Sequence, residues 1–312
     1  MSKNILFVYS DILQKETLEQ CEVILKAALK RFRKRADITY MQFDFSPLGF
    51  ALSEKKLLSA IKNSDAVIWD TSEVPRESEL NLAVKSLGIF AEVHKVGAST
   101  LLSPLSQRQV SFDSDILAET NSLCKENLQK TAKLAATFSK QQKKAITLCF
   151  DYENTLYGKI LCREFEKALP LYGRIEMSEL SYNEFLWKCA SCVPDFPLLL
   201  TSEKEAEIVR LNLCALKKFP ACYTVWHSDN LSIYKRESLP YEKMNNSPVA
   251  GLLIACAEAI DKELGYRNVG LHLKKCVALA LEKYAFSPKE DFTNEVLFLI
   301  NSRIRKKKEN KI

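Results

Sequence analysis

The fold is decided by Ile5-Leu6-Phe7-Val8-Tyr9, which runs directly into Ser10-Asp11-Ile12-Leu13-Gln14-Lys15-Glu16. A short apolar run that enters a helical pattern through a turn indicates a β-strand followed by an α-helix. Backbone approaches a phosphate closely only where side chains are absent, and this turn contains no glycine. Because the 312 residues include only 8 glycines, the sequence predicts no phosphate-cradling loop here.

The alternation of strand and helix continues outward from this stretch. Strands are expected at residues 4–9, 38–43, 66–69, 90–96, 146–150, 175–180, 198–201 and 223–226. After Ser247-Pro248, a favoured helix start, only helices are expected, at residues 247–265, 269–284 and 293–307. The pattern predicts an α/β fold with a large, mostly parallel mixed sheet and helices on both faces.

Composition limits the class of protein. The chain is 47% hydrophobic, which is enough for a full core and two domains. No apolar run approaches the roughly 18 residues of a membrane span, and the N-terminus lacks a signal-peptide pattern, so we expect a cytoplasmic protein. The ten cysteines are interpreted as small buried hydrophobes. A redox or zinc role for the Cys189–Cys192 pair would need a second ligand pair or a thioredoxin-like context.

The positive charge is concentrated at the C-terminal end. Six basic residues and one glutamate between Arg303 and Lys311 account for +5 of the formal net charge of +6. A basic tail can hold nucleic acid electrostatically. No aromatic residue is interleaved with it, however, and cations are favoured near a helix C-terminus in any case, so the sequence favours a solvated helix end.

Several segments together carry a family resemblance. They are residues 4–29, residues 65–70 followed by 79–96, Leu102-Ser103-Pro104-Leu105, Phe150-Asp151-Tyr152-Glu153-Asn154-Thr155-Leu156 and the helix start at Ser247-Pro248. In these segments and in the order of its elements, the chain resembles the isocitrate and isopropylmalate dehydrogenase family. Nearly the whole chain is covered, although each motif has diverged.

The resemblance implies a fold and an activity. Members of the family oxidise a 2-hydroxy acid with NAD or NADP and remove its β-carboxylate with the help of magnesium or manganese. The implied first domain comprises residues 1–96 plus 224–312, and the implied second, dimerisation-type domain comprises residues 97–223. The chain is shorter than its relatives after Asn121, which leaves the family's mode of dimerisation open.

The positions that the resemblance assigns to substrate binding have changed. The family grips substrate carboxylates with arginines, whose planar fork makes two charge-assisted bonds. The matching positions hold His94, Leu101 and Ala118, and the one arginine between Ala91 and Cys124 is Arg108. Leucine and alanine cannot bind an anion.

The catalytic and metal positions have changed as well. The family's catalytic lysine matches Tyr152, and its proton-donating tyrosine falls near Cys124 or Lys125. A hard divalent ion wants several carboxylate oxygens, but the matching positions hold Asn183, Glu207 and Leu211.

Vestigial catalytic positions are therefore Tyr152 and Asn183, and Glu207 is a vestigial metal position. Glu207 also follows Glu203 and Glu205 at a helix start, where the helix dipole alone favours acids. On the cofactor side, residues 233–240 place bulky side chains where the resemblance implies that the phosphates of the cofactor come close to the backbone.

Three polar residues are candidates for a retained substrate pocket: His94, Glu119 and Asn154. Open α/β sheets place their sites at strand ends, where these residues are expected. A histidine in such a place is also commonly a hydrogen-bonded structural residue. Both interpretations stay open at this point.

Three hypotheses follow for the function. The first is a noncatalytic relative of the dehydrogenases, which acts as a regulatory or scaffolding subunit or as a small-molecule sensor without a resident cofactor. Its expected partners are a second copy of the chain, an active family dehydrogenase or a small ligand, and neither a membrane nor nucleic acid. The second is an active dehydrogenase that uses NAD and Mg²⁺ and gives new roles to Tyr152, Glu119 and Glu207. The third is a nucleic-acid-associated protein that binds through the basic tail.

Overall fold

The computed structural model describes residues 3–10, 12–44, 47–70, 86–96, 99–105, 107–113, 116–122, 125–191, 196–216, 222–236, 247–284 and 289–302. The chain forms two compact units. The first unit comprises Met1–Asp44, Ser53–Glu73 and Arg236–Ile312, and the second comprises Phe45–Leu52 and Val74–Lys235. The first unit thus contains both ends of the chain. The domain boundaries expected after residues 96 and 223 stay a prediction.

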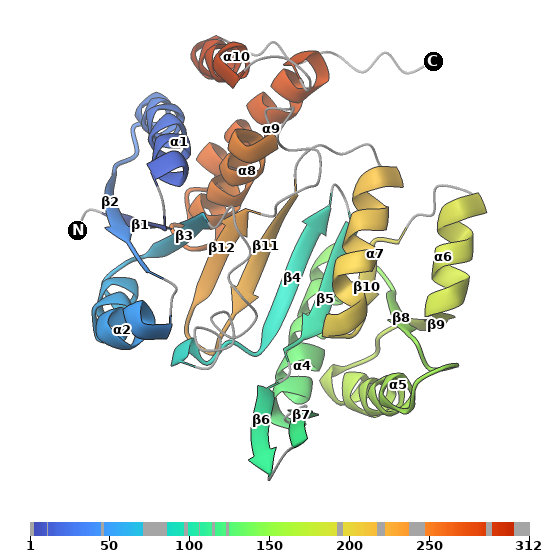
Figure 1. Ribbon diagram of the computed structural model, residues 1–312. Helices are drawn as coiled ribbons and strands as arrows, with labels where there is room; N and C mark the ends of the chain where they lie inside the picture. The colour runs from blue at the N-terminus through green and yellow to red at the C-terminus, as the bar shows by residue number, and fades with distance from the viewer. Residues whose placement is uncertain are drawn as a thin grey trace, which may run out of the picture. The chain divides into compact units, whose positions relative to one another are not determined.

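Strands and helices alternate along most of the chain (Figure 1). The strands are β1 (Lys3–Tyr9), β2 (Ala36–Gln42), β3 (Ala66–Asp70), β4 (Ala91–Val96), β5 (Ser99–Pro104), β6 (Gln107–Asp113), β7 (Ile116–Ser122), β8 (Ile146–Phe150), β9 (Met177–Ser181), β10 (Leu198–Leu200), β11 (Cys222–His227) and β12 (Ser232–Arg236). The helices are α1 (Ile12–Arg31), α2 (Pro47–Lys62), α4 (Lys125–Gln142), α5 (Leu156–Ala168), the 3₁₀ turn η1 (Leu169–Tyr172), α6 (Tyr182–Ser191), α7 (Glu203–Leu216), α8 (Ser247–Lys262), α9 (Arg267–Tyr284) and α10 (Lys289–Asn301).

The main sheet is mixed and has ten strands within the described chain, and β6 and β7 form a separate antiparallel pair. In the first unit the strand order is β2-β1-β3, and β1 is parallel to both neighbours. In the second unit the order is β12-β11-β4-β5-β10-β8-β9. There β4 is antiparallel to β11 and β5, whereas β5, β10, β8 and β9 are parallel. The predicted α/β class with a large mixed sheet is confirmed.

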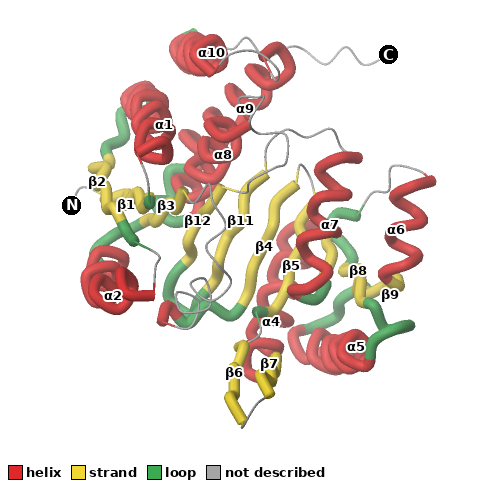
Figure 2. Tube along the Cα trace, viewed as in Figure 1, coloured by secondary structure: helices red, strands yellow, loops and turns green. Residues whose placement is uncertain are grey.

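The cores follow from the apolar patterns of the sequence. Strand β1 is buried from Ile5 to Tyr9, and α1 buries Leu18, Cys21 and Leu25, which follow one another at three- and four-residue spacing. In the first unit α8 packs against β3, α1 and α9 pack against α8 and against each other, and α10 packs against α1 and α9. In the second unit α4 and α7 both contact β5, with α7 in front of it and α4 behind it (Figure 2).

Three parts of the sequence-based assignment need correction. Residues 233–236 were assigned to a loop at the phosphate approach, but they belong to strand β12, while residues 237–240 lie outside the described residues. Strands β5, β6 and β7 were not predicted. Helix α10 begins at Lys289, four residues before its expected start. None of the helices in the described ranges combines the length and hydropathy that crossing a membrane requires.

Candidate functional site

The turn after β1 is closed by a side chain of the protein itself. The Gln14 side chain is buried, and its Oε1 accepts hydrogen bonds from the backbone N–H of Ser10, at 2.6 Å, and from the Ser10 hydroxyl, at 2.9 Å. An anion bound at this helix N-terminus would need such backbone donors. The N–H of Ser10 therefore has an internal acceptor where a nucleotide-binding turn would present it to a phosphate.

A buried polar group lies on one face of three neighbouring strands of the second unit. We call it the β4–β11 cluster, and it consists of Glu92, His94, Thr224, Trp226 and Lys235. Glu92 is paired with Trp226 and His94 with Thr224 in the antiparallel register of β4 and β11. Side chains two residues apart on a strand share a face, so the register brings these four together.

Glu92 is the centre of the β4–β11 cluster. The Trp226 indole N–H donates to its Oε1, and Lys235 Nζ lies 3.8 Å from the same atom and 4.4 Å from the centre of the Trp226 ring. The Glu92 and Lys235 side chains are 13% and 15% exposed. A carboxylate can stay buried only when it is paired and hydrogen-bonded, and these neighbours supply both conditions.

His94 is held by the same cluster. Its Nδ1 lies 2.6 Å from Thr224 Oγ1, and its Nε2 lies 3.6 Å from Glu92 Oε2. The side chain is only 6% exposed. His94 thus lies within strand β4 as a hydrogen-bonded residue, whereas the sequence suggested the end of a strand. Leu101, the next of the changed arginine positions, is buried opposite His94 in β5.

Two predicted positions lie on β7. Glu119 is paired with Val110 and Ala118 with Ser111. Glu119 lies within the strand, and its side chain lies outside what the structure describes. The same holds for the side chain of Arg108 on β6. A pocket role for Glu119 stays a prediction.

The turn after β8 is built from its own side chains. Asn154 Nδ2 donates to Asp151 Oδ1 at 2.8 Å, and Thr155 Oγ1 donates to the Asp151 carbonyl at 2.7 Å. Thr155 also caps α5 by accepting the Gly158 N–H at 3.0 Å. At Gly158 a Cβ atom would lie 2.4 Å from the Asp151 carbonyl oxygen, so this close approach requires glycine. Asn154 is exposed, and its side-chain amide already donates the hydrogen bond to Asp151 within the turn.

Tyr152 lies in acidic surroundings. Burial raises the pKa of its hydroxyl, and the negative charges of Glu184, Glu153 and Glu179 raise it further. A raised tyrosine pKa keeps the phenol protonated at neutral pH. Tyr152 can donate a hydrogen bond, but it cannot supply the positive charge of a lysine.

The predicted metal positions do not form a set of carboxylates. Asn183 is neutral, and its Nδ2 donates to Glu153 Oε2 at 3.1 Å. Glu207 is exposed on α7, and Leu211 has no ligand atom. These residue types do not fit the several carboxylate oxygens that Mg²⁺ prefers. Residues 237–240, the second half of the stretch expected at the phosphate approach, lie outside the described ranges.

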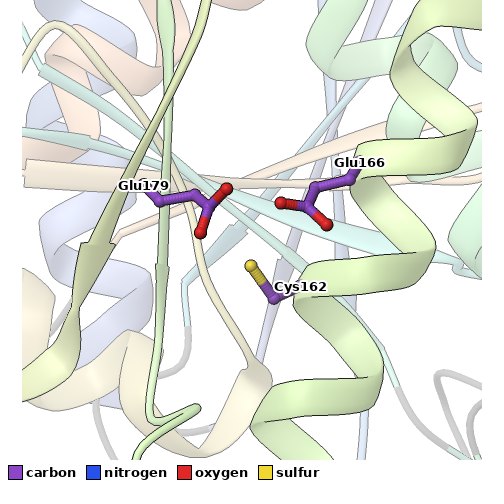
Figure 3. A group of neighbouring side chains, drawn as sticks. All are labelled: Cys162, Glu166 and Glu179. Atoms are coloured by element: carbon purple, nitrogen blue, oxygen red, sulfur yellow. The ribbon is translucent and has the colours of Figure 1, made fainter.

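A different group of possible ligands was not predicted from the sequence. Cys162 and Glu166 on α5 and Glu179 on β9 converge, and one ligand atom from each lies within 4.8 Å of the other two (Figure 3). Within the described ranges this is the one set of three such residues. The available signal was a cysteine and a glutamate four residues apart, which lie on the same face of a helix.

Other candidates contribute little to a site. A buried ion pair joins Arg236 to Asp70, with Arg236 Nε 3.1 Å from Asp70 Oδ1, at the carboxyl end of β3 in the first unit. Cys189 is buried, while Cys192 lies outside the described residues. The basic tail from Arg303 to Lys311 also lies outside them. The nucleic-acid hypothesis therefore stays a prediction.

Comparison with known proteins finds similarity in sequence over part of the chain and similarity in fold over nearly all of it. No protein-family model matches. The 3-isopropylmalate dehydrogenase of Helicobacter hepaticus is 24% identical over 257 residues, which are 67% of this chain and 70% of that protein. The apo crystal structure of a β-decarboxylating dehydrogenase from Thermococcus kodakarensis has a TM-score of 0.74 at 16% identity and covers 96% of each chain. A protein from Thermus thermophilus has a TM-score of 0.75 at 13% identity, over 98% of this chain and 69% of that one.

Proposed function

Because the chain belongs to the isocitrate/isopropylmalate dehydrogenase family, we propose that it is a noncatalytic relative of the β-decarboxylating dehydrogenases. In this proposal it acts as a regulatory or scaffolding subunit, or as a small-molecule sensor. The observation that carries the proposal is the internal pairing of the β4–β11 cluster, at the position where the family resemblance implies an anion-gripping arginine.

The β4–β11 cluster argues against binding of an acidic substrate at His94. Glu92 already presents a carboxylate to the Trp226 indole and to Lys235. A substrate carboxylate brought to the same side chains would meet a buried like charge, which raises the free energy of the complex. Glu92 thus neutralises Lys235 inside the protein, as the carboxylate of an acidic substrate would otherwise do.

The position of Tyr152 supports the same conclusion. Loss of a positioned acid–base group typically lowers a rate on the order of 10²- to 10⁴-fold. Tyr152 is protonated and surrounded by Glu184, Glu153 and Glu179, so an incoming acidic substrate would be repelled. The absence of a carboxylate set at Asn183 and Leu211 removes a metal's contribution to transition-state stabilisation as well.

One observation favours the alternative of an active NAD- and Mg²⁺-dependent dehydrogenase. The relative that matches two thirds of the chain is named as a 3-isopropylmalate dehydrogenase. In that case Tyr152, Glu119 and Glu207 would carry new roles. A cytoplasmic location, a dimeric state and an active dehydrogenase as partner are retained here as parts of the proposal.

Turnover distinguishes the two functions. The purified full chain is incubated with NAD or NADP, with 3-isopropylmalate or isocitrate, and with Mg²⁺ or Mn²⁺, and reduced nicotinamide is followed by absorbance. A competent family dehydrogenase is the positive control, and the Tyr152→Phe variant is the control for contaminating host enzyme. We expect no formation of reduced nicotinamide above background. Turnover that requires substrate and metal and falls in Tyr152→Phe would overturn the proposal.

A second measurement tests the sensor and subunit roles. A ligand that binds only the native state raises the melting temperature, so a thermal-shift panel of hydroxy acids and nucleotides reports on sensing. Mixing with an active family dehydrogenase, followed by size-exclusion chromatography and measurement of that enzyme's kcat, reports on regulation. We expect one of the two assays to respond, and silence in both would contradict the proposal.

A further inference from the structure

The convergence of Cys162, Glu166 and Glu179 is independent of the proposed function. We call it the α5–β9 group. Cys162 and Glu166 lie one turn apart on the face of α5 that is directed toward β9, and Glu179 extends from β9 toward the helix (Figure 3). The ligand atoms of all three lie within 4.8 Å of one another. One sulfur donor and two carboxyl donors therefore point at a common space.

Cys162 distinguishes this group from an ordinary cluster of surface acids. The residue is only 5% exposed, and its thiol is directed between the two carboxyl groups (Figure 3). Its Sγ makes no hydrogen bond within the described part of the chain. A buried, unpartnered thiol aimed at two carboxyl groups is a ligand arrangement that packing alone does not require.

The electrostatics of the group call for a cation. A hydrogen bond to Glu166, which the protonated form of Glu179 donates, raises the pKa of Glu179, and burial adds to the effect. Burial also raises the pKa of the Cys162 thiol to about 12, with further contributions from Glu166 and Glu179. No cationic side chain is among the causes of either shift. A bound cation would therefore offset the repulsion among these acidic groups.

We propose that Cys162, Glu166 and Glu179 bind a divalent cation of borderline softness, with Zn²⁺ the best match. A set of one thiolate and two carboxylates suits zinc, since Mg²⁺ and Ca²⁺ prefer oxygen ligands alone. Zinc bond lengths of about 2.0 to 2.3 Å would draw in any pair of these atoms that is separated by the full 4.8 Å. Glu179 is exposed and free to make that movement, and a water molecule would complete a four-coordinate site.

Binding of Zn²⁺ releases protons from the side chains that become its ligands. Zn²⁺ forms bonds to the Cys162 sulfur and to one oxygen each of Glu166 and Glu179. The thiol proton leaves to solvent, together with any proton bound to the two carboxyl groups. Because these protons compete with the metal, affinity rises with pH and is lost as the pH falls.

The site lies apart from the positions that the family resemblance assigns to a metal. Those positions are Asn183 on α6 and Glu207 and Leu211 on α7, and none of them is a member of the α5–β9 group. Metal binding here consequently does not restore or require dehydrogenase activity. The inference stands whether the proposed function is right or wrong.

Direct titration of the metal tests the inference. The full-length, chelator-treated protein is titrated with Zn²⁺ by calorimetry and with Cd²⁺ by the ultraviolet cadmium–thiolate absorption band. Cys162→Ser, Glu166→Gln and Glu179→Gln are compared with two matched controls, Cys189→Ser for a buried thiol and Glu164→Gln for a carboxylate on the same helix. Circular dichroism and melting temperature confirm that each variant is folded.

We expect one equivalent of Zn²⁺, with affinity lowered by at least about 10- to 100-fold in each ligand variant, since even outer-shell losses have effects of that size. The cadmium–thiolate band should vanish in Cys162→Ser and persist in Cys189→Ser. Absence of Zn²⁺ binding by the wild type, or binding that the controls weaken as much as the ligand variants do, would overturn the proposal. Glu166→Gln and Glu179→Gln keep the test decisive if Cys162→Ser fails to fold.

Discussion

The β4–β11 cluster and the α5–β9 group both bring carboxyl groups close to other polar side chains, but only the β4–β11 cluster pairs its carboxylate with a cation. In the β4–β11 cluster a buried carboxylate, Glu92, contacts the cationic Lys235 and the Trp226 indole N–H. In the α5–β9 group two carboxyl groups and a thiol face one another, and no cationic side chain is among the causes of the pKa shifts of Glu179 and Cys162. A carboxylate that is paired with a cation inside the protein contributes to the stability of the fold. Carboxyl groups that lack such a cation are available to bind a cationic ligand. We therefore assign structure to the first region and binding to the second.

The largest effect is expected from Glu92→Ala, which removes the centre of the β4–β11 cluster. The change leaves Lys235 and His94 buried without their carboxylate, and breaking a buried charge pair costs about 3 kcal/mol. Urea denaturation measures the free energy of unfolding. The control is Glu164→Ala, whose exposed pair with Lys167 should give no resolvable change. Equal stabilities of the two variants would mean that the cluster is not a structural unit.

A smaller effect is expected from Tyr152→Lys, which gives the acidic region the cation it lacks. The new ammonium group would face Glu184, Glu153 and Glu179. It would compete with a metal ion for electrostatic attraction to these three carboxyl groups. An added charge near a surface site is worth about 1 kcal/mol, so Zn²⁺ affinity should fall about fivefold. Calorimetry measures it, with Leu171→Lys as an exposed control of equal charge. Tighter zinc binding in Tyr152→Lys would contradict the assigned electrostatics.

The smallest effect concerns the pH dependence of Glu179 in metal-free protein. Its pKa is raised above the ordinary value of 4.5 in the folded state. The folded state thus binds this proton more tightly than the unfolded chain does, and ionising the group lowers stability as the pH rises through that range.

Glu179→Gln should accordingly be more stable than the wild type at pH 7, by at most about 0.5 kcal/mol because the carboxyl is exposed to screening solvent. The difference should disappear as the pH falls below 4.5, the ordinary value of the group. Urea denaturation at pH 7 and pH 4 with a chelator measures it. A wild type that is the more stable of the two at pH 7 would show that Glu179 is paired with a cation in the protein.

The sequence predicted elements whose own residues carry a strong pattern. The apolar run of β1 and the helical pattern of α1 could be recognised because apolar residues recur with the period of the element. Strand β12 was missed because Ile233-Tyr234-Lys235-Arg236 follows a short turn and carries two charges, which are typical of a loop. The structure buries both charges through partners elsewhere in the chain: Glu92 for Lys235 and Asp70 for Arg236.

The candidate site was harder to predict than the fold. The identities at His94, Tyr152 and Asn183 already indicated that the family's chemistry had changed. Their environments were not readable, because Thr224 lies 130 residues from His94 in the sequence and reaches it only through the register of β4 and β11. The expected role of Glu119 and the basic tail remain predictions.

By itself, the sequence determined the α/β class, the β1–α1 start and the loss of the arginine and lysine positions, because these depend on local periodicity and on residue identity. Only the tertiary structure decided which charges are neutralised within the protein and which converge without a cation. Pairing of β8 with β9 and packing of α5 on β8 set the distances in the α5–β9 group. Electrostatic energy depends on distance and burial, which no local pattern encodes.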